Sequence, residues 1–158
     1  MHGAHKCIIS AFYETLVSLF PAIFFVLACG ISFATGTSWG TFGVLVPIAV
    51  AVLGGSSTMA VITVSATLGG AVFGDHVSPI SDTTIMASTG AACNHIDHVK
   101  TQFPYAAITA VIALIGYVVA GFIANLGGVV SGLIMWAVVA VLFVGVIFLI
   151  KYLQKKKA

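Results

Sequence analysis

Charged side chains are scarce in this sequence of 158 residues. They make up 6% of the chain, whereas a soluble domain carries roughly 25%. Arginine is absent, and all six basic residues are lysines. Hydrophobic residues make up 60% and the mean hydropathy is +1.18, which excludes an ordinary water-soluble domain and leaves lipid as the expected solvent. The net charge of +2 is too small to indicate a nucleic-acid partner.

Cysteine is also sparse. The three cysteines, Cys7, Cys29 and Cys93, lie far apart and form no Cys-x-x-Cys pair. This spacing excludes a disulfide framework and a thiolate zinc site, so we interpret them as small apolar residues or unpaired thiols. We expect no bound cofactor.

Long apolar runs dominate what remains, with room for about five membrane segments of roughly 20 residues each. We predict an all-α polytopic membrane protein with a re-entrant hairpin, one broken helix and two full transmembrane helices. The expected segments are an interfacial stretch at 1–15, a membrane domain at 16–150 (hairpin 16–55, broken helix 59–92, polar loop 93–102, spans 103–126 and 129–150) and a basic tail at 151–158.

The predicted hairpin has unequal arms. Residues 16–35 are apolar, with Pro21 near the start, where proline is tolerated in a first helical turn. Residues 34–41 are mostly small and hydroxyl residues around Trp39, and the following apolar run, at 42–54, is too short to cross a bilayer easily. This pattern favours a re-entrant hairpin that faces protein or a watery cavity. An ordinary loop with its tryptophan at the membrane interface is the alternative.

Residues 74–84 read Gly-Asp-His-Val-Ser-Pro-Ile-Ser-Asp-Thr-Thr and hold two of the four acidic residues, between strongly apolar segments. Ionisable groups inside a membrane are costly and indicate a functional site. Pro79 removes a backbone hydrogen bond and biases the residue before it toward extended backbone, so we predict a helix broken near 75–82. Gly70 and Gly74 have the small-xxx-small spacing that lets helices pack closely.

The lysines predict the orientation in the membrane. Lys151 and the lysines at 155–157 follow the last expected span, and lysine excess favours the cytoplasmic side. Counting back two spans places Lys100 on the same side, which agrees. We therefore expect a multi-pass protein of the inner (plasma) membrane with its C-terminus in the cytoplasm.

The broken stretch offers oxygen ligands. A broken helix frees backbone carbonyls, which together with carboxylates and hydroxyls suit a hard cation such as Na⁺. A buried carboxylate also takes up a proton more readily, so one site that holds Na⁺ or H⁺, but not both, is sufficient for exchange. The candidate ligands are Asp75, Asp82, Ser78, Ser81, Thr83 and Thr84.

Histidines occur in two places near these ligands. His76 lies within the stretch and could titrate near neutral pH as a sensor or proton relay. A neutral histidine that is hydrogen-bonded to a carboxylate is the alternative. The pattern His95-x-Asp97-His98 has a spacing that could chelate a metal, but we favour a solvated, pH-responsive loop there.

Three motifs resemble signatures of the NhaC-type Na⁺/H⁺ antiporters. They are Thr35-Gly-Thr-Ser-Trp-Gly-Thr41 followed by Pro47-Ile-Ala, the stretch 74–84, and the segment from His95 to Ala106. The resemblance, which runs from about Leu16 onward, implies an inner-membrane carrier built from two inverted repeats. In each repeat a re-entrant hairpin and a broken helix face each other at the ion site. On that pattern Thr37 and Ser38 join the site, and Na⁺ and H⁺ are transported.

The resemblance reaches only the C-terminal repeat of that pattern. It implies a fragment, or a half that pairs with the missing N-terminal half or with itself. The expected function is exchange of Na⁺ for H⁺ at an intramembrane carboxylate, which is transport and not enzymatic catalysis. The alternatives are a carrier that couples Na⁺ or H⁺ to an organic acid or other small solute, a metal-dependent membrane enzyme, and an inert remnant.

Overall fold

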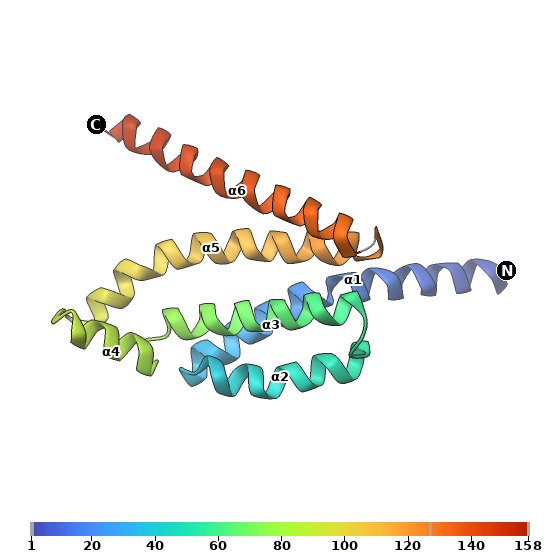
Figure 1. Cartoon of the computed structure of the whole chain (residues 1–158), viewed down its shortest axis with the longest axis horizontal. Coiled ribbons are helices and arrows are strands. Elements are labelled where there is room, and N and C mark those ends of the chain that lie inside the picture. The colour runs from blue at the N-terminus through green and yellow to red at the C-terminus, as the bar shows by residue number, and fades with distance from the viewer. Residues whose placement is uncertain (1, 127, 158) are drawn as a thin grey trace.

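The computed structural model describes residues 2–126 and 128–157, and all regular structure in those residues is helical (Figure 1). The predicted all-α class is therefore confirmed. The elements are α1 (His2–Thr35), α2 (Ser38–Leu53), α3 (Thr58–Val77), α4 (Asp82–Gly90), α5 (His95–Ile123), the short 3₁₀ helix η1 (Ala124–Leu126) and α6 (Gly128–Lys157).

Three helices in the described part of the chain are long and apolar enough to cross a membrane: Phe12–Thr35, Thr58–Val77 and His95–Ile123. The protein is thus a multi-pass membrane protein. Helix α2 has 16 residues. Its length of about 24 Å is less than the roughly 30 Å of a hydrocarbon core. The second arm of the hairpin is therefore the short one, and its re-entry into the membrane stays a prediction.

Helix α1 is continuous, whereas the sequence predicted an interfacial segment at 1–15 and a separate arm from residue 16. Pro21 therefore lies in the helix interior and not in a first turn. Residues 4–20 contain no glycine or proline, so nothing stops the helix from starting early. A proline inside a membrane helix is tolerated where neighbouring helices cover it, and Pro21 is fully buried.

A tight turn at Gly36 and Thr37 joins α1 to α2. Gly36 has a φ of +67°, a conformation that favours glycine, and its N–H donates to the Ser32 carbonyl at 2.8 Å. Thr37 caps α2 by accepting a hydrogen bond from the Gly40 N–H at 3.4 Å. The tip predicted within residues 34–41 is therefore located at these two residues.

Helix α3 packs closely against α1 (Figure 1). A Cβ atom at Gly70 would meet the Phe25 carbonyl oxygen, and a Cβ atom at Gly74 would meet the Cys29 carbonyl oxygen. Both glycines thus allow the backbones of the two helices to touch. The close packing predicted from the small-xxx-small spacing is confirmed, and it fixes the end of α3 beside the end of α1.

Helix α5 begins at His95, so the polar loop predicted at 93–102 is wrong for all but its first two residues. Asn94 caps the helix by accepting hydrogen bonds from the N–H groups of Ile96 and Asp97. Asp97 lies in the first turn, where its negative charge complements the helix dipole. The low hydropathy of residues 93–102 indicated a segment outside the lipid, which we interpreted as a loop. From His95 onward these polar residues are helical.

Helix α6 leaves α5 at an angle, and the two helices diverge toward the C-terminus (Figure 1). The span predicted at 129–150 lies within α6. The helix continues to Lys157 through most of the basic tail predicted at 151–158, of which residue 158 lies outside the described residues.

Candidate functional site

The predicted interruption of the helix is present, because α3 ends at Val77 and α4 begins at Asp82. Between them Ser78 and Ser81 have extended backbone, with ψ angles of 129° and 132°. Pro79 lacks an N–H and disfavours helical backbone in the residue before it, which favours a break at this position. The break lies at one end of the bundle, next to the tip between α1 and α2 (Figure 1).

The tip packs directly on the break. Ser78 is fully buried, and its hydroxyl donates to the Phe33 carbonyl near the end of α1 at 2.8 Å. A Cβ atom at Gly36 would lie 2.8 Å from the Ile80 carbonyl oxygen, so a glycine is required there for steric reasons as well as for its φ angle. The α1–α2 turn and the segment 78–81 are therefore packed together.

Asp75 lies in the last turn of α3 and is only 7% exposed. Its Oδ2 accepts a hydrogen bond from the Ser38 hydroxyl at 3.1 Å, and its Oδ1 accepts one from the Ser81 hydroxyl at 2.7 Å. Ser38 is the first residue of α2 and Ser81 immediately precedes α4, so three segments meet at this carboxylate. Both donors come from helix N-termini, whose partial positive charge stabilises a carboxylate.

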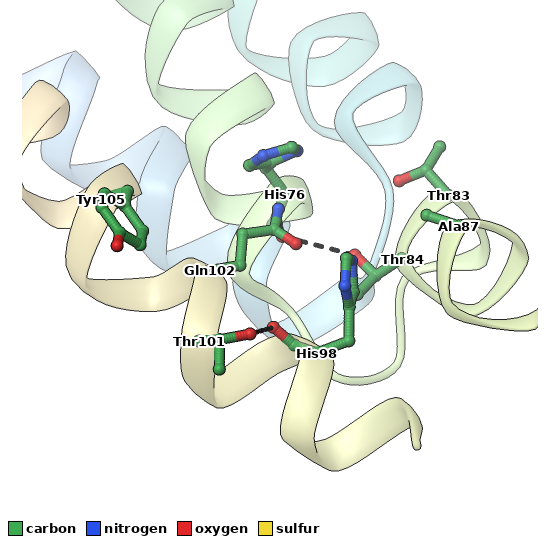
Figure 2. Close-up of a pocket in the computed structure, with 8 residues that line it drawn as sticks. All are labelled: His76, Thr83, Thr84, Ala87, His98, Thr101, Gln102 and Tyr105. Atoms are coloured by element: carbon green, nitrogen blue, oxygen red, sulfur yellow. Dashed lines mark hydrogen bonds between the residues drawn. The ribbon is translucent and has the colours of Figure 1, made fainter. Parts of the chain in front are cut away.

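A second hydroxyl extends this cluster. Ser81 Oγ also lies 2.7 Å from Thr83 Oγ1. A hydroxyl has one hydrogen to donate, so when Ser81 donates to Asp75, Thr83 donates to Ser81. Thr83 is exposed and lines a pocket of about 580 Å³ (Figure 2). A line of two hydroxyls therefore leads from the pocket to the buried carboxylate.

Asp82 accepts its hydrogen bond from a backbone group and not from these hydroxyls. Its side chain is exposed, and its Oδ1 accepts a hydrogen bond from the Thr83 N–H at 2.8 Å in the first turn of α4. An acidic group at this position stabilises the start of a helix. The structure therefore does not bring the two predicted aspartate ligands together: Asp75 is buried, and Asp82 faces the start of its own helix.

Three of the predicted hydroxyl ligands bind backbone groups instead, and one of them is Ser78, which donates to the Phe33 carbonyl. The buried Thr84 donates to the His76 carbonyl at 3.3 Å, and Thr37 caps α2. The side chain of His76 is exposed and lines the pocket (Figure 2). The pocket is lined by His76, Thr83, Thr84, Ala87, His98, Thr101, Gln102 and Tyr105.

His95 was not among the predicted site residues. Its Nε2 lies 2.7 Å from the Pro79 carbonyl oxygen, and its Nδ1 lies 3.0 Å from Ser88 Oγ. The interpretation as a solvated loop is therefore wrong for His95, which is half-buried and bonded to the break. The predicted break could have pointed to His95. A helix end frees backbone carbonyls that need hydrogen-bond donors, and the polar residues that follow the break can supply them. Among the described residues no group of three or more His, Cys, Asp or Glu side chains could hold a metal ion.

A buried carboxylate beside a broken helix, in a bundle of apolar helices, is the arrangement of secondary transporters. Residues 8–122 match the Na⁺/H⁺ antiporter family, and the chain belongs to that family.

Three curated relatives cover most of this chain. An uncharacterized protein of Haemophilus influenzae is 51% identical over 132 residues, which is 83% of this chain and 24% of the relative. The arginine/ornithine antiporter ArcD of Halobacterium salinarum is 41% identical over 120 residues (73% and 25%). The malate-2H⁺/Na⁺-lactate antiporter of Bacillus subtilis is 36% identical over 114 residues (70% and 24%). The chain thus spans about a quarter of the length of these relatives. No solved structure matches it.

Proposed function

We propose that this chain supplies one ion-binding part of a membrane antiporter that exchanges Na⁺ for H⁺, with the two ions competing for Asp75. The observation that carries the proposal is the burial of this carboxylate, 7% exposed, between the hydroxyls of Ser38 and Ser81. An ionised carboxylate inside a membrane is costly unless a proton or a cation neutralises it. Na⁺ and H⁺ each neutralise the carboxylate, so the binding of one ion displaces the other.

The hydroxyls around Asp75 suit both ligands. A hydroxyl carries one donor hydrogen and two acceptor lone pairs. Ser38 and Ser81 donate hydrogen bonds to the carboxylate at 3.1 and 2.7 Å. With Na⁺ at the carboxylate, the same hydroxyls rotate to present their oxygens, which are the ligands that hard cations prefer. Exchange of the two ions at this site then needs only small local movements.

The hydroxyl line provides a route for the proton. Thr83 lines the pocket and contacts Ser81, which contacts Asp75. A proton that enters from the pocket reaches the carboxylate through these two hydroxyls, each passing on a proton as it receives one. In this proposal Asp82 stabilises the start of α4 and does not bind the transported ion.

A complete carrier needs more chain than is present here. Secondary transporters place their site between two repeats. This chain, which spans about a quarter of its relatives, has one hairpin and one broken helix. We propose that a further segment, or a second copy of this chain, completes the site from the opposite side. We also propose insertion in the inner membrane with the lysine-rich C-terminus in the cytoplasm.

A carrier for an organic solute is the second candidate. Two relatives are named as antiporters of arginine and ornithine and of malate and lactate. The pocket of about 580 Å³ has room for such a solute, and its eight lining residues include no carboxylate. His76 and His98 could face the carboxylate of the solute while Asp75 binds the coupling ion. The named relatives are transporters, which favours transport over a membrane enzyme.

Carbodiimide labelling of the chain in lipid vesicles tests the proposal. Dicyclohexylcarbodiimide modifies protonated carboxyl groups, and mass spectrometry of peptides reports each acid separately. We expect Na⁺, exchanged for choline at constant ionic strength, to slow the labelling of Asp75 but not that of Asp82. The substitution Asp82→Asn should leave this protection intact. Labelling of Asp75 that is independent of Na⁺ would contradict the proposal.

Transport is measured on the same material. Na⁺-driven proton movement in inside-out vesicles is followed with a pH-sensitive dye, with Asp75→Asn beside the unchanged chain. A signal that Asp75→Asn abolishes supports exchange by assembled copies of this chain. A proton signal that appears only when lactate, malate or arginine is added would favour the second candidate.

A further inference from the structure

The break between α3 and α4 leaves backbone carbonyls without helical partners. The last four carbonyls of a helix and those of the extended segment must find other donors when they are buried. Two of these carbonyls, those of His76 and Pro79, accept hydrogen bonds from side chains of α5. Gln102 Nε2 donates to the His76 carbonyl at 3.0 Å, and His95 Nε2 lies 2.7 Å from the Pro79 carbonyl.

Both donors lie on one face of the start of α5. His95 and Gln102 are seven residues apart, which is two helical turns, so their side chains leave the helix on the same side. Figure 2 shows Gln102 reaching from α5 toward the backbone of His76, which Thr84 approaches from α4. The first turns of α5 therefore hold the end of α3 and the extended segment at once.

The bond from His95 does not depend on the charge of its ring. A carbonyl only accepts, so Nε2 carries a hydrogen in either protonation state. Nδ1 faces Ser88, whose hydroxyl is also 2.9 Å from the Ile85 carbonyl. When the ring is neutral, Ser88 donates to Nδ1; when it is protonated, Nδ1 donates to Ser88, and Ser88 donates to the carbonyl. The link to Pro79 persists in both states.

We propose that His95 is a positioning residue for the ion site. It fixes the Pro79 carbonyl, two residues before Ser81, and through Ser88 it also holds α4. These contacts keep the Ser81 hydroxyl 2.7 Å from Asp75. His95 thereby sets the affinity of the site for its ion without touching the ion. The inference rests on the proposed role of Asp75, but the hydrogen bonds of His95 can be tested separately.

Three substitutions of His95 separate the bond from the volume of the ring. In His95→Gln the amide nitrogen reaches the place of Nε2 and can still donate to Pro79. In His95→Asn the shorter amide reaches only the place of Nδ1, toward Ser88. His95→Ala removes both donors. Ile96→Ala is the matched control, because this exposed side chain lies in the same turn of α5.

Two measurements are made on each variant in lipid nanodiscs. Hydrogen–deuterium exchange of the peptide that covers residues 78–82 reports the order of the break and needs no ion. The Na⁺ concentration that halves carbodiimide labelling of Asp75 reports the site. For His95→Asn and His95→Ala we expect the exchange rate of residues 78–82 and the Na⁺ concentration for half-protection to rise about five- to tenfold. This is the effect of one lost buried hydrogen bond. His95→Gln and Ile96→Ala should stay within about twofold of the unchanged chain.

Each outcome decides the proposal. If the Gln, Asn and Ala variants all show the same faster exchange and weaker Na⁺ protection, the ring only fills space. That result would overturn the proposal. Unchanged exchange in His95→Ala would overturn it too. If Na⁺ fails to protect Asp75 in the unchanged chain, the proposed function fails, while the exchange of residues 78–82 still shows whether His95 holds the break. Na⁺ protection of Asp75 that weakens in His95→Ala and His95→Asn but stays unchanged in His95→Gln would support the proposal.

Discussion

The hydroxyl of Ser81 lies 2.7 Å from one carboxylate oxygen of Asp75, and the other oxygen accepts a hydrogen bond from Ser38 at 3.1 Å. One donor is six residues away in sequence and the other is 37. The carboxylate is therefore sensitive both to the local shape of the break and to the placement of the hairpin tip. Substitutions of the two serines and of the glycines that pack these segments together separate the two dependences.

Removal of either hydroxyl should weaken the site. Ser81→Ala leaves Oδ1 of a buried carboxylate without this donor, which costs about 1–3 kcal/mol. We expect the Na⁺ concentration for half-protection of Asp75 to rise about tenfold in Ser81→Ala, and less in Ser38→Ala because its bond is longer. Ser56→Ala, in an exposed turn, is the control. A larger effect of Ser38→Ala than of Ser81→Ala would contradict the geometry.

Gly36→Ala should separate the hairpin tip from the break. The new side chain would have an unfavourable φ and would press on the Ile80 carbonyl oxygen. We expect a loss of about 1–3 kcal/mol in the free energy of unfolding, measured by thermal melting in detergent. Gly30→Ala is the matched control, since nothing lies within 4 Å of its Cβ position and alanine favours a helix. Equal melting temperatures for the two variants would rule out the close contact.

Gly74→Ala should force α3 away from α1. Its Cβ would meet the Cys29 carbonyl oxygen and would lie 2.9 Å from the Phe33 nitrogen, both of which are backbone atoms that cannot rotate aside. Overpacking of this kind costs about 1–3 kcal/mol, and here it also displaces the neighbouring Asp75. We expect a lower melting temperature together with weaker Na⁺ protection. Gly43→Ala, with open space around it, should leave both unchanged.

The break and the close packing of α3 could be predicted because their causes are local. Pro79 removes one backbone hydrogen bond and disfavours helical backbone at Ser78, a local bias toward a break, although Pro21, Pro47 and Pro104 lie inside helices. Gly70 and Gly74 present a smooth helix surface that another helix can approach. Neither inference needed to know which element would be the neighbour.

The carboxylate that is buried could not be predicted in the same way. Asp75 and Asp82 are equally polar and flank the same break, and what distinguishes Asp75 is its burial between Ser81 and Ser38, the second of which arrives from a distant helix. His95 was missed for a related reason. Its polar neighbourhood indicated a loop, but the cap at Asn94 makes that stretch the start of α5, and the ring then faces the break.

The contacts between the hairpin tip and the break constrain how the proposed carrier can move. Ser78 is bonded to the Phe33 carbonyl, and Ile80 lies against Gly36, so sliding one element past the other would break a buried hydrogen bond. A hinge inside this region is therefore unfavourable. Hairpin and broken helix should travel as one rigid block, and the swing that opens the site to each side of the membrane should occur where this block meets the rest of the assembled carrier.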